Sequence, residues 1–300
     1  MTSAIDWNKL KIFHAAADAG SFTRAGEMLS LSQSAISRQV SALEDELGVP
    51  LFHRHARGLK LTEQGETLYR TAHEVSAKLA MAEAVLGETR QKPSGSLKIT
   101  TTVGLGSTWL TPRIGEFLAL YPDLTVDLVL EDRVLDLSMG EADIAIRLRP
   151  STQRDLVQRK LLTVHNHLYA SSEYLRRHGS PTDVRDLAHH RIIAYGDDAY
   201  SPVPEVNWLI EIGERAGVQI RPVLNVNNVH GQLMAVESGL GIAALPDYTV
   251  QSNPRVVQVI PEISGPSFDA YFVYPDELRD SKKIAAFRDF LLAKVSAWRF

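Results

Sequence analysis

The spacing of apolar residues in this chain changes once, at residues 91–96. The change separates a first part that predicts helices from a second part that predicts strands alternating with helices. Before this segment apolar residues recur at helical spacing, and after it strand-like runs alternate with helical stretches. The segment itself, Gln-Lys-Pro-Ser-Gly-Ser, has the composition of a linker. A length of 300 residues suits two or three packed units.

Composition excludes several classes of protein. Hydrophobic residues make up 44% and charged residues 23% of the chain, which indicates a soluble, folded protein. The absence of cysteine excludes disulfides, thiolate metal sites and a cysteine nucleophile. No apolar run reaches the about 18 residues of a membrane-spanning helix. Asp6, Trp7 and Lys9 interrupt the region where a secretory signal would be apolar, so we expect a cytoplasmic protein.

The first part predicts three short helices, over residues 7–19, 21–29 and 32–47, followed by a hairpin at 51–61. The third helix has an inward stripe at helical spacing, formed by Ile36, Val40, Leu43 and Leu47. Its polar side chains then face solvent. Three helices followed by a hairpin are typical of a winged helix-turn-helix that binds DNA.

The predicted DNA-binding residues are polar or basic and lie on the third helix and the hairpin: Gln33, Ser34, Ser37, Arg38, Arg54 and Arg57. Gln33 suits an adenine edge and Arg38 a guanine or a phosphate, while small serines permit close approach to the bases. The hairpin arginines suit phosphates or the minor groove. Residues 1–62 hold seven basic and six acidic side chains, so the positive charge must gather on one face.

A long helix is predicted beyond Thr62, ending near Thr89. Its apolar and small residues alternate at spacings of four and three: Leu68, Ala72, Val75, Leu79, Ala82 and Leu86. This spacing is that of a coiled-coil seam, so we predict that the helix dimerises. The alternative is a single amphipathic helix that packs on its own domain.

The second part alternates strands and helices, which predicts mostly parallel sheets covered by helices. The first series has strands at 97–103, 126–130 and 142–147 and helices near 110–120 and 134–140. The second series has strands at 168–171, 192–195, 220–226 and 242–245 and a helix at 228–239. A strand at 271–274 and a helix at 281–300 end the chain.

Ligands of such sheets bind at the carboxyl ends of the strands. The candidate residues there are Thr101, Thr102, Glu131, Arg147, Asn227 and Asn228. Threonine hydroxyls and the backbone N–H groups of 104–107 suit a carboxylate or hydroxyl, and Arg147 suits an anion. The alternatives are that Thr102 and the two asparagines cap helices, and that Arg147 pairs with Glu131 or Asp132.

Several stretches of the sequence resemble those of the LysR-type transcriptional regulators. Residues 19–65 read AGSFTRAGEMLSLSQSAISRQVSALEDELGVPLFHRHARGLKLTEQG, with the residues of that family in its order and spacing. The resemblance continues in GEADIAIRLR at 140–149 and AVESGLGIAALP at 235–246. The stretches TTTVGLGSTWLTPRIGEFLALYP and FVYPDELRDSKKIAAFRDFLLAK are similar to an alphaproteobacterial subgroup, the LsrB/VtlR-like regulators.

The resemblance implies an α plus α/β protein: a winged helix-turn-helix (1–62), a linker and dimerisation helix (63–92) and a periplasmic-binding-protein-like effector domain (93–300). The effector domain would comprise subdomain I (93–165 and 268–300) and subdomain II (166–267), joined by two crossover strands, with the effector in their cleft. A tetramer of two dimers and effector-dependent DNA bending are also implied. Expected partners are double-stranded DNA, a non-covalent small-molecule co-inducer and RNA polymerase.

Other functions have weaker support in the sequence. Two histidine pairs, His53 with His55 and His165 with His167, offer too few ligands for a stable zinc site, so we predict no metal and no other cofactor. A binding protein whose N-terminal helices serve only as a dimer adaptor is one alternative. An enzyme is another, although a phosphate-binding Gly-rich loop, a nucleophile elbow and a metal motif are all absent from the sequence. We therefore predict no catalytic residues.

Overall fold

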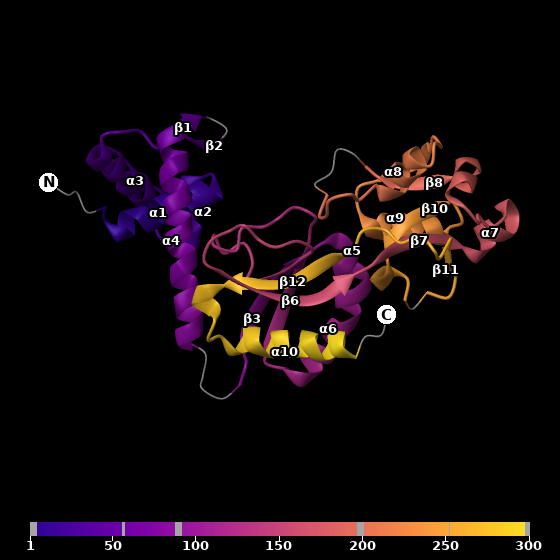
Figure 1. Ribbon diagram of the computed structural model, residues 1–300. Coiled ribbons are helices and arrows are strands. Elements are labelled where there is room, and N and C mark those ends of the chain that lie inside the picture. Colours follow the sequence, from indigo (N-terminus) through magenta and orange to yellow (C-terminus); the bar gives the residue numbers. More distant parts are fainter. Residues whose placement is uncertain (1–4, 56–57, 88–91, 197–200, 252, 298–300) are drawn as a thin grey trace. The chain divides into compact units, whose positions relative to one another are not determined.

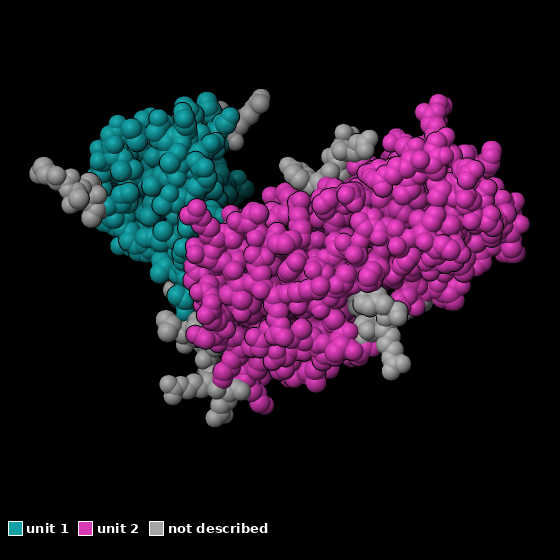
Figure 2. Space-filling view, in the orientation of Figure 1, with its two compact units in different colours: residues 1–84, 138–140 teal, residues 85–137, 141–300 magenta. Residues whose placement is uncertain are grey.

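The computed structural model describes residues 5–55, 58–87, 92–196, 201–251 and 253–297. The chain forms two compact units (Figure 2), one of residues 1–84 with 138–140 and one of residues 85–137 with 141–300. None of the described helices combines the length and apolar character that crossing a membrane requires.

The first unit contains three short helices, a hairpin and a long helix (Figure 1): α1 (Trp7–Ala19), α2 (Phe22–Leu29), α3 (Gln33–Leu47), β1 (Phe52–His55), β2 (Gly58–Leu61) and α4 (Glu63–Gly87). Each short helix follows a residue whose side chain accepts a hydrogen bond from a backbone N–H of the first turn: Asp6, Ser21 and Ser32. Each ends in left-handed backbone, at Gly20, Ser30 and Gly48. These caps set the helix bounds, and the predicted helices are confirmed.

The turn between α2 and α3 is tight because it contains Gly26. A Cβ atom at this position would lie 2.6 Å from the carbonyl oxygen of Leu31, a distance that real Cβ atoms do not adopt. The backbone N–H of Leu31 instead donates to the carbonyl of Gly26 at 2.8 Å. Because residue 26 has no side chain, the backbone can turn tightly between α2 and α3.

The core of the first unit includes the predicted inward stripe of α3, with Ile36, Val40 and Leu43 fully buried. The hairpin joins this core through Phe52, whose ring lies 5.3 Å from that of Phe13 on α1. Packing of the hairpin against the helices makes the unit one body, as expected for a winged helix-turn-helix.

The helix α4 starts in this core and then leaves it. Ala72 is 1% exposed and Leu68 packs against the same cluster, so these two residues serve their own domain. Val75 and Leu79 are 37% and 45% exposed, and Ala82 is also exposed. The intradomain alternative thus holds for the first half of the predicted seam, and dimerisation stays a prediction for the second half. The side chain of Leu86 lies outside the described residues.

The second unit contains two five-stranded sheets. The first has the order β4-β3-β5-β12-β6, from β3 (Gly95–Thr101), β4 (Leu124–Leu130), β5 (Ile144–Arg147), β6 (Leu156–Val164) and β12 (Phe268–Pro275). The second has the order β11-β7-β10-β8-β9, from β7 (Asn166–Ser171), β8 (Ile192–Tyr195), β9 (Pro222–Val226), β10 (Ile242–Pro246) and β11 (Val256–Val259). The chain passes between the sheets twice, after β6 and before β12.

Both sheets are mixed, which corrects the prediction of mostly parallel sheets. In the first, β3 is parallel to β4 and β5, but β12 is antiparallel to β5 and β6. In the second, β10 and β9 are parallel to β8, but β7 is antiparallel to β10 and β11. The antiparallel pairs involve strands that carry the chain to or from the other sheet, so no local βαβ unit sets their direction.

Helices cover each sheet. The first sheet has α5 (Val103–Leu105), a π-helical turn (Gly106–Leu110), α6 (Thr111–Leu120) and α10 (Lys282–Ser296); α6 and α10 pack through Phe117 and Phe287, whose rings lie 5.0 Å apart. The second sheet has α7 (Ser172–His178), α8 (Trp208–Arg215) and α9 (Val229–Glu237).

The helix predicted near 134–140 does not form. The backbone N–H of Asp136 donates to the side chain of Glu141, whose own N–H donates to the carbonyl of Asp136, so this segment closes into turns. Leu135 and Leu137 are both buried, which is a spacing of two rather than a helical stripe. The apolar side chains of this segment are therefore buried in a packed loop rather than along one face of a helix.

We expect Gly26→Ala to destabilise the first unit by about 1–3 kcal/mol, because the added methyl group collides with backbone that cannot rotate away. Urea unfolding followed by circular dichroism measures this loss. The matched control is Gly115→Ala, since a Cβ on Gly115 in α6 meets open space. That variant should be as stable as the parent chain or more so. Equal unfolding curves for Gly26→Ala and the parent would contradict this role of Gly26.

Candidate functional sites

The polar face of α3 lies opposite its buried stripe. Gln33, Ser34 and Arg38 are exposed and Ser37 is half-buried. The Arg38 Nε donates to the backbone carbonyl of Ser34 at 3.3 Å, which lays the guanidinium along the first turns of the helix. The structure thus brings these four predicted residues together on one accessible surface. The side chain of Arg54, in β1, and all of Arg57 lie outside the described residues.

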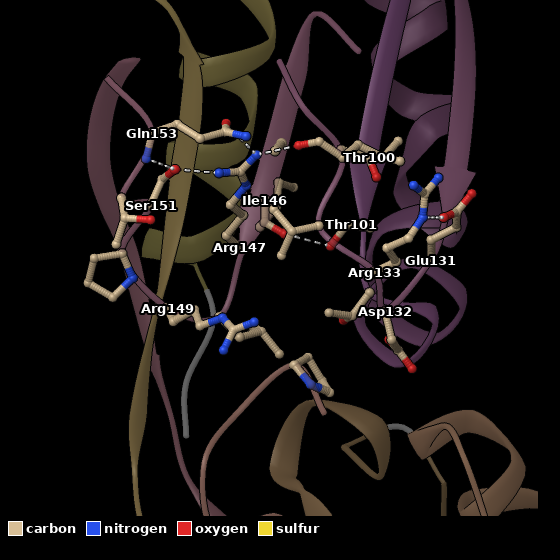
Figure 3. Close-up of a pocket in the computed structure, with 18 residues that line it drawn as sticks. Thr100, Thr101, Glu131, Asp132, Arg133, Ile146, Arg147, Arg149, Ser151 and Gln153 are labelled. Atoms are coloured by element: carbon tan, nitrogen blue, oxygen red, sulfur yellow. Dashed lines mark hydrogen bonds and ion pairs between the residues drawn. The ribbon is translucent and has the colours of Figure 1, made fainter. Parts of the chain in front are cut away.

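A pocket of about 440 Å³ opens at the carboxyl ends of β3 and β5. Three segments at or just after the ends of β3, β4 and β5 line it (Figure 3), namely residues 100–102, 131–135 and 145–153. Pro202, between β8 and α8, lines it as well. Four predicted ligand residues, Thr101, Thr102, Glu131 and Arg147, line it.

The two predicted asparagines do not line this pocket. Asn228 accepts a hydrogen bond from the backbone N–H of Gly231 at 2.7 Å and caps α9, so the capping alternative holds for it. Asn227 is exposed, and its side-chain oxygen accepts from the side chain of Asn228. Thr102 also caps a helix, by accepting from the N–H of Leu105 at 3.4 Å, but it lies in the pocket wall as well.

Arg147 is held by its own chain. Its side chain is buried, with the residue 8% exposed, and the guanidinium donates to the carbonyl of Leu135 at 2.8 Å, to Gln153 at 3.2 Å and to Ser151. Burial lowers the pKa of this guanidinium, and nearby Asp136 opposes the shift. These bonds replace the salt bridge to Glu131 or Asp132 that was the alternative for Arg147. Arg147 therefore positions two walls of the pocket.

Arg149 is a pocket residue that the sequence analysis missed. It is exposed, it lines the same pocket, and it has no hydrogen-bond or ion-pair partner within the described part of the chain. Figure 3 shows its side chain reaching into the pocket, apart from that of Arg147. Arg133 differs, because its Nε pairs with Glu131 at 3.2 Å. The available signal was a second arginine two residues beyond Arg147, in the segment that follows the end of β5.

Asp132 links the two sheets of the second unit. Its carboxylate accepts a hydrogen bond from the backbone N–H of Val103 at 3.1 Å and from the hydroxyl of Tyr195, in β8, at 3.0 Å. Burial raises the pKa of the Asp132 carboxyl, and these two bonds oppose the rise. A narrow crevice of about 30 Å³ continues from the pocket between the sheets, and both cavities share Thr102 and Asp132.

A second contact crosses near the same place. The side chain of Tyr248, which follows β10, is buried and hydrogen-bonds to the side chain of Thr102. Gly104 allows this approach, because a Cβ there would lie 2.8 Å from Val229 and 3.3 Å from the Tyr248 hydroxyl. Two hydrogen-bonded pairs, Asp132 with Tyr195 and Thr102 with Tyr248, therefore join the two sheets here.

We expect Asp132→Asn to raise the unfolding temperature at neutral pH. The raised pKa means that the charged form of Asp132 is less favourable in the folded chain than in the unfolded chain. Asparagine removes this charge and can still form hydrogen bonds with Tyr195 and Val103. The gain is full above the folded pKa of Asp132. It should disappear as the pH falls towards about 4, where unfolded aspartate protonates.

Thermal unfolding between pH 4 and pH 8 measures this difference. The exposed Asp123, before β4, provides the control variant Asp123→Asn, which should show no such pH-dependent gain. If Asp132→Asn were less stable by a constant amount at every pH, the hydrogen bonds rather than the buried charge would dominate at this site.

Two family models match this chain. Residues 90–296 match the model described as "LysR substrate binding domain". Residues 7–66 match the model described as "Bacterial regulatory helix-turn-helix protein, lysR family". Together the two matches include both candidate sites.

The relatives agree with these models. The chain is 32% identical to an HTH-type transcriptional regulator of Xanthomonas campestris pv. campestris, over 97% of this chain and 86% of the relative. It is 31% identical to the regulator YhjC of Escherichia coli, over 94% and 95% of the two chains. The solved structure of CrgA from Neisseria meningitidis, described as a LysR-type transcriptional regulator, covers 98% of this chain and 99% of its own at 26% identity, with a TM-score of 0.59.

A more distant structure shares the fold. Full-length LysG of Corynebacterium glutamicum covers 97% of this chain and 98% of its own at 22% identity, with a TM-score of 0.62. These comparisons give no support to the narrower resemblance to LsrB/VtlR-like regulators, because the relatives come from gammaproteobacteria and Neisseria. That narrower prediction is withdrawn.

Proposed function

Because the chain belongs to the LysR family of transcriptional regulators, with a helix-turn-helix DNA-binding domain and an effector-binding domain, we propose that its effector is a small anion held by Arg149. The single observation behind this proposal is the Arg149 guanidinium, which has no hydrogen-bond or ion-pair partner among the described residues, in a pocket where Arg133 and Arg147 are both engaged. Arg149 is exposed, and its guanidinium can bind a carboxylate in bidentate geometry.

The rest of the pocket suits a carboxylate-bearing molecule. Thr100, Thr101 and Thr102 line one wall, where the Thr101 hydroxyl donates to the carbonyl of Ile146 and the Thr102 hydroxyl accepts from the N–H of Leu105. The volume of about 440 Å³ falls within the range of about 300–1,000 Å³ that small-molecule sites occupy. LysG, which shares this fold, was solved with bound effector Arg, and an amino acid carries a carboxylate. Arg147 contributes by holding the segments around Leu135 and Ser151 in place.

The contacts across the cleft give a bound ligand a way to act on the effector domain. Asp132 and Thr102 border the pocket and also bond to Tyr195 and Tyr248 of the other sheet. A ligand that changes these bonds changes the angle between the sheets, and this couples two states of the effector domain. The assembly proposed to transmit the change is a tetramer of two dimers, whose DNA bending differs between the states.

Several features of this function follow from the family and remain proposals for this chain. Dimerisation through Val75 and Leu79 of α4 is supported by their exposure. The relatives are named as transcriptional regulators, which supports binding of the effector without chemical turnover. A cytoplasmic location and a contact with RNA polymerase at the promoter complete the proposal.

For DNA binding, we expect Arg38→Ala to weaken specific binding by about 1–3 kcal/mol, which is roughly 5- to 150-fold in Kd. Duplexes selected from a random pool by the parent protein provide the probe, and fluorescence anisotropy gives the affinities. The control is Arg215→Ala, an exposed residue on α8 that pairs with Glu211 of its own helix. Unchanged affinity in Arg38→Ala would remove Arg38 from the DNA-binding surface.

For the effector, we expect Arg149→Ala to abolish the thermal stabilisation that a responsive carboxylate gives the parent chain. A panel of small carboxylates, with their neutral amides for comparison, is screened by thermal unfolding. Arg149→Lys should keep part of the response because it keeps the charge, and Arg176→Ala on the exposed surface of α7 should keep all of it. Equal stabilisation of Arg149→Ala and the parent would refute the anion proposal and leave the DNA-binding function intact.

A further inference from the structure

Four side chains of α1 and α4 interlock within the first unit. His14 and Asp18 lie one turn apart on α1, and Tyr69 and His73 lie one turn apart on α4. Residues four apart share a helix face, so each helix presents a pair to the other. The two histidines are 59 positions apart in the sequence, so only the packing of α1 against α4 brings them together.

The ligand atoms of three of these residues converge. His14 Nε2 lies 2.9 Å from His73 Nδ1, and His14 Nδ1 lies 3.5 Å from Asp18 Oδ2. One nitrogen of each histidine and one carboxylate oxygen of Asp18 all lie within 4.8 Å of one another. Ligand atoms around a tetrahedral zinc ion lie roughly 3.3 Å apart, given bonds of about 2.0–2.1 Å. The two short contacts use different nitrogens of His14, which cannot bind one ion together, so the set closes around an ion only after side-chain rotations that bring a single His14 nitrogen to both partners.

The surroundings hold these ligands in place. The Tyr69 hydroxyl donates to Asp18 Oδ1 at 2.5 Å, which leaves Oδ2 turned towards His14. The Tyr69 ring also stacks on the His14 ring, with centroids 5.5 Å apart and planes 12° apart. His14 and His73 are both half-buried, so their rings have less freedom than surface histidines. Outer contacts of this kind orient metal ligands and tune their affinity.

We propose that His14, Asp18 and His73 form a binding site for a divalent transition-metal ion, with Zn²⁺ as the best match. Two imidazole nitrogens and one carboxylate oxygen are the donor types that zinc prefers, and water completes a fourth position. The surface pair His53 and His55 differs: its ring centroids lie 6.2 Å apart, and the described residues place no third ligand beside it. The proposal is independent of the effector pocket.

An ion at this place would join α1 to α4. Because α1 packs against α3, the bound metal would hold the helix-turn-helix against the start of the linker helix. Any ligand that binds only the folded unit raises its stability in proportion to RT ln(1 + [L]/Kd). Metal binding should therefore appear both as a stoichiometric event and as a rise in unfolding temperature.

The test uses the full chain, freed of metal with a chelator and then dialysed. Titration calorimetry with Zn²⁺ should give one high-affinity ion per chain, and thermal unfolding should shift upward with Zn²⁺. His73→Gln should lose this site and the shift. Tyr69→Phe should weaken binding by about 10- to 100-fold, since it removes an outer contact of Asp18. His55→Gln, on the hairpin, is the matched control and should bind like the parent.

Co²⁺ provides a readout that a folding defect would not mimic. The parent chain should give the intense visible absorption of tetrahedral Co²⁺, and His73→Gln should not, although circular dichroism without metal shows that it is folded. If His73→Gln and His55→Gln bound Zn²⁺ equally, the ion would be an adventitious surface ligand and the proposal would fail. Absence of any Zn²⁺-dependent stabilisation in the parent would overturn it as well.

Discussion

Asp132 carries a half-buried negative charge where the two sheets of the second unit meet, and this charge requires hydrogen-bond donors from the surrounding chain. The backbone of Val103 and the hydroxyl of Tyr195 provide its hydrogen bonds, one from each sheet. Burial of a charge costs free energy unless such partners are present. The same residue borders the pocket and the crevice, so a ligand in either cavity would lie beside the contact that joins the two sheets.

The DNA-binding unit has a comparable dependence on one junction. Thr62, just before α4, donates its hydroxyl hydrogen to the carbonyl of Pro50 and accepts from the N–H of Gly65, which ties the long helix to the end of α3 and to the hairpin. The first half of α4 then completes the core through Ala72. Among the described residues, Val75 and Leu79 in the second half of α4 are exposed apolar side chains. One helix thus completes its own domain and then presents apolar surface to solvent.

Local signals predicted much of this structure, and contacts between distant residues account for what was missed. The caps Ser21 and Ser32 and the terminal Gly48 set helix bounds that were readable from sequence. The edge strands β6 and β11 were missed, because charged residues interrupt the first and the second is four residues long. In the pocket, Thr102 was predicted and Arg149 was not. Asn228 looked like a ligand because a capping residue and a ligand share one sequence signature.

Recognition of specific DNA through α3 is tested most directly by a mobility-shift assay with the DNA upstream of this chain's own gene, across a salt series and with excess unrelated competitor. We expect a retarded complex that survives the competitor and weakens steeply as salt rises, since phosphate contacts release counterions. A folded, oligomeric protein that retards no such fragment at micromolar concentration would contradict specific DNA binding, and the N-terminal helices would then be a dimer adaptor.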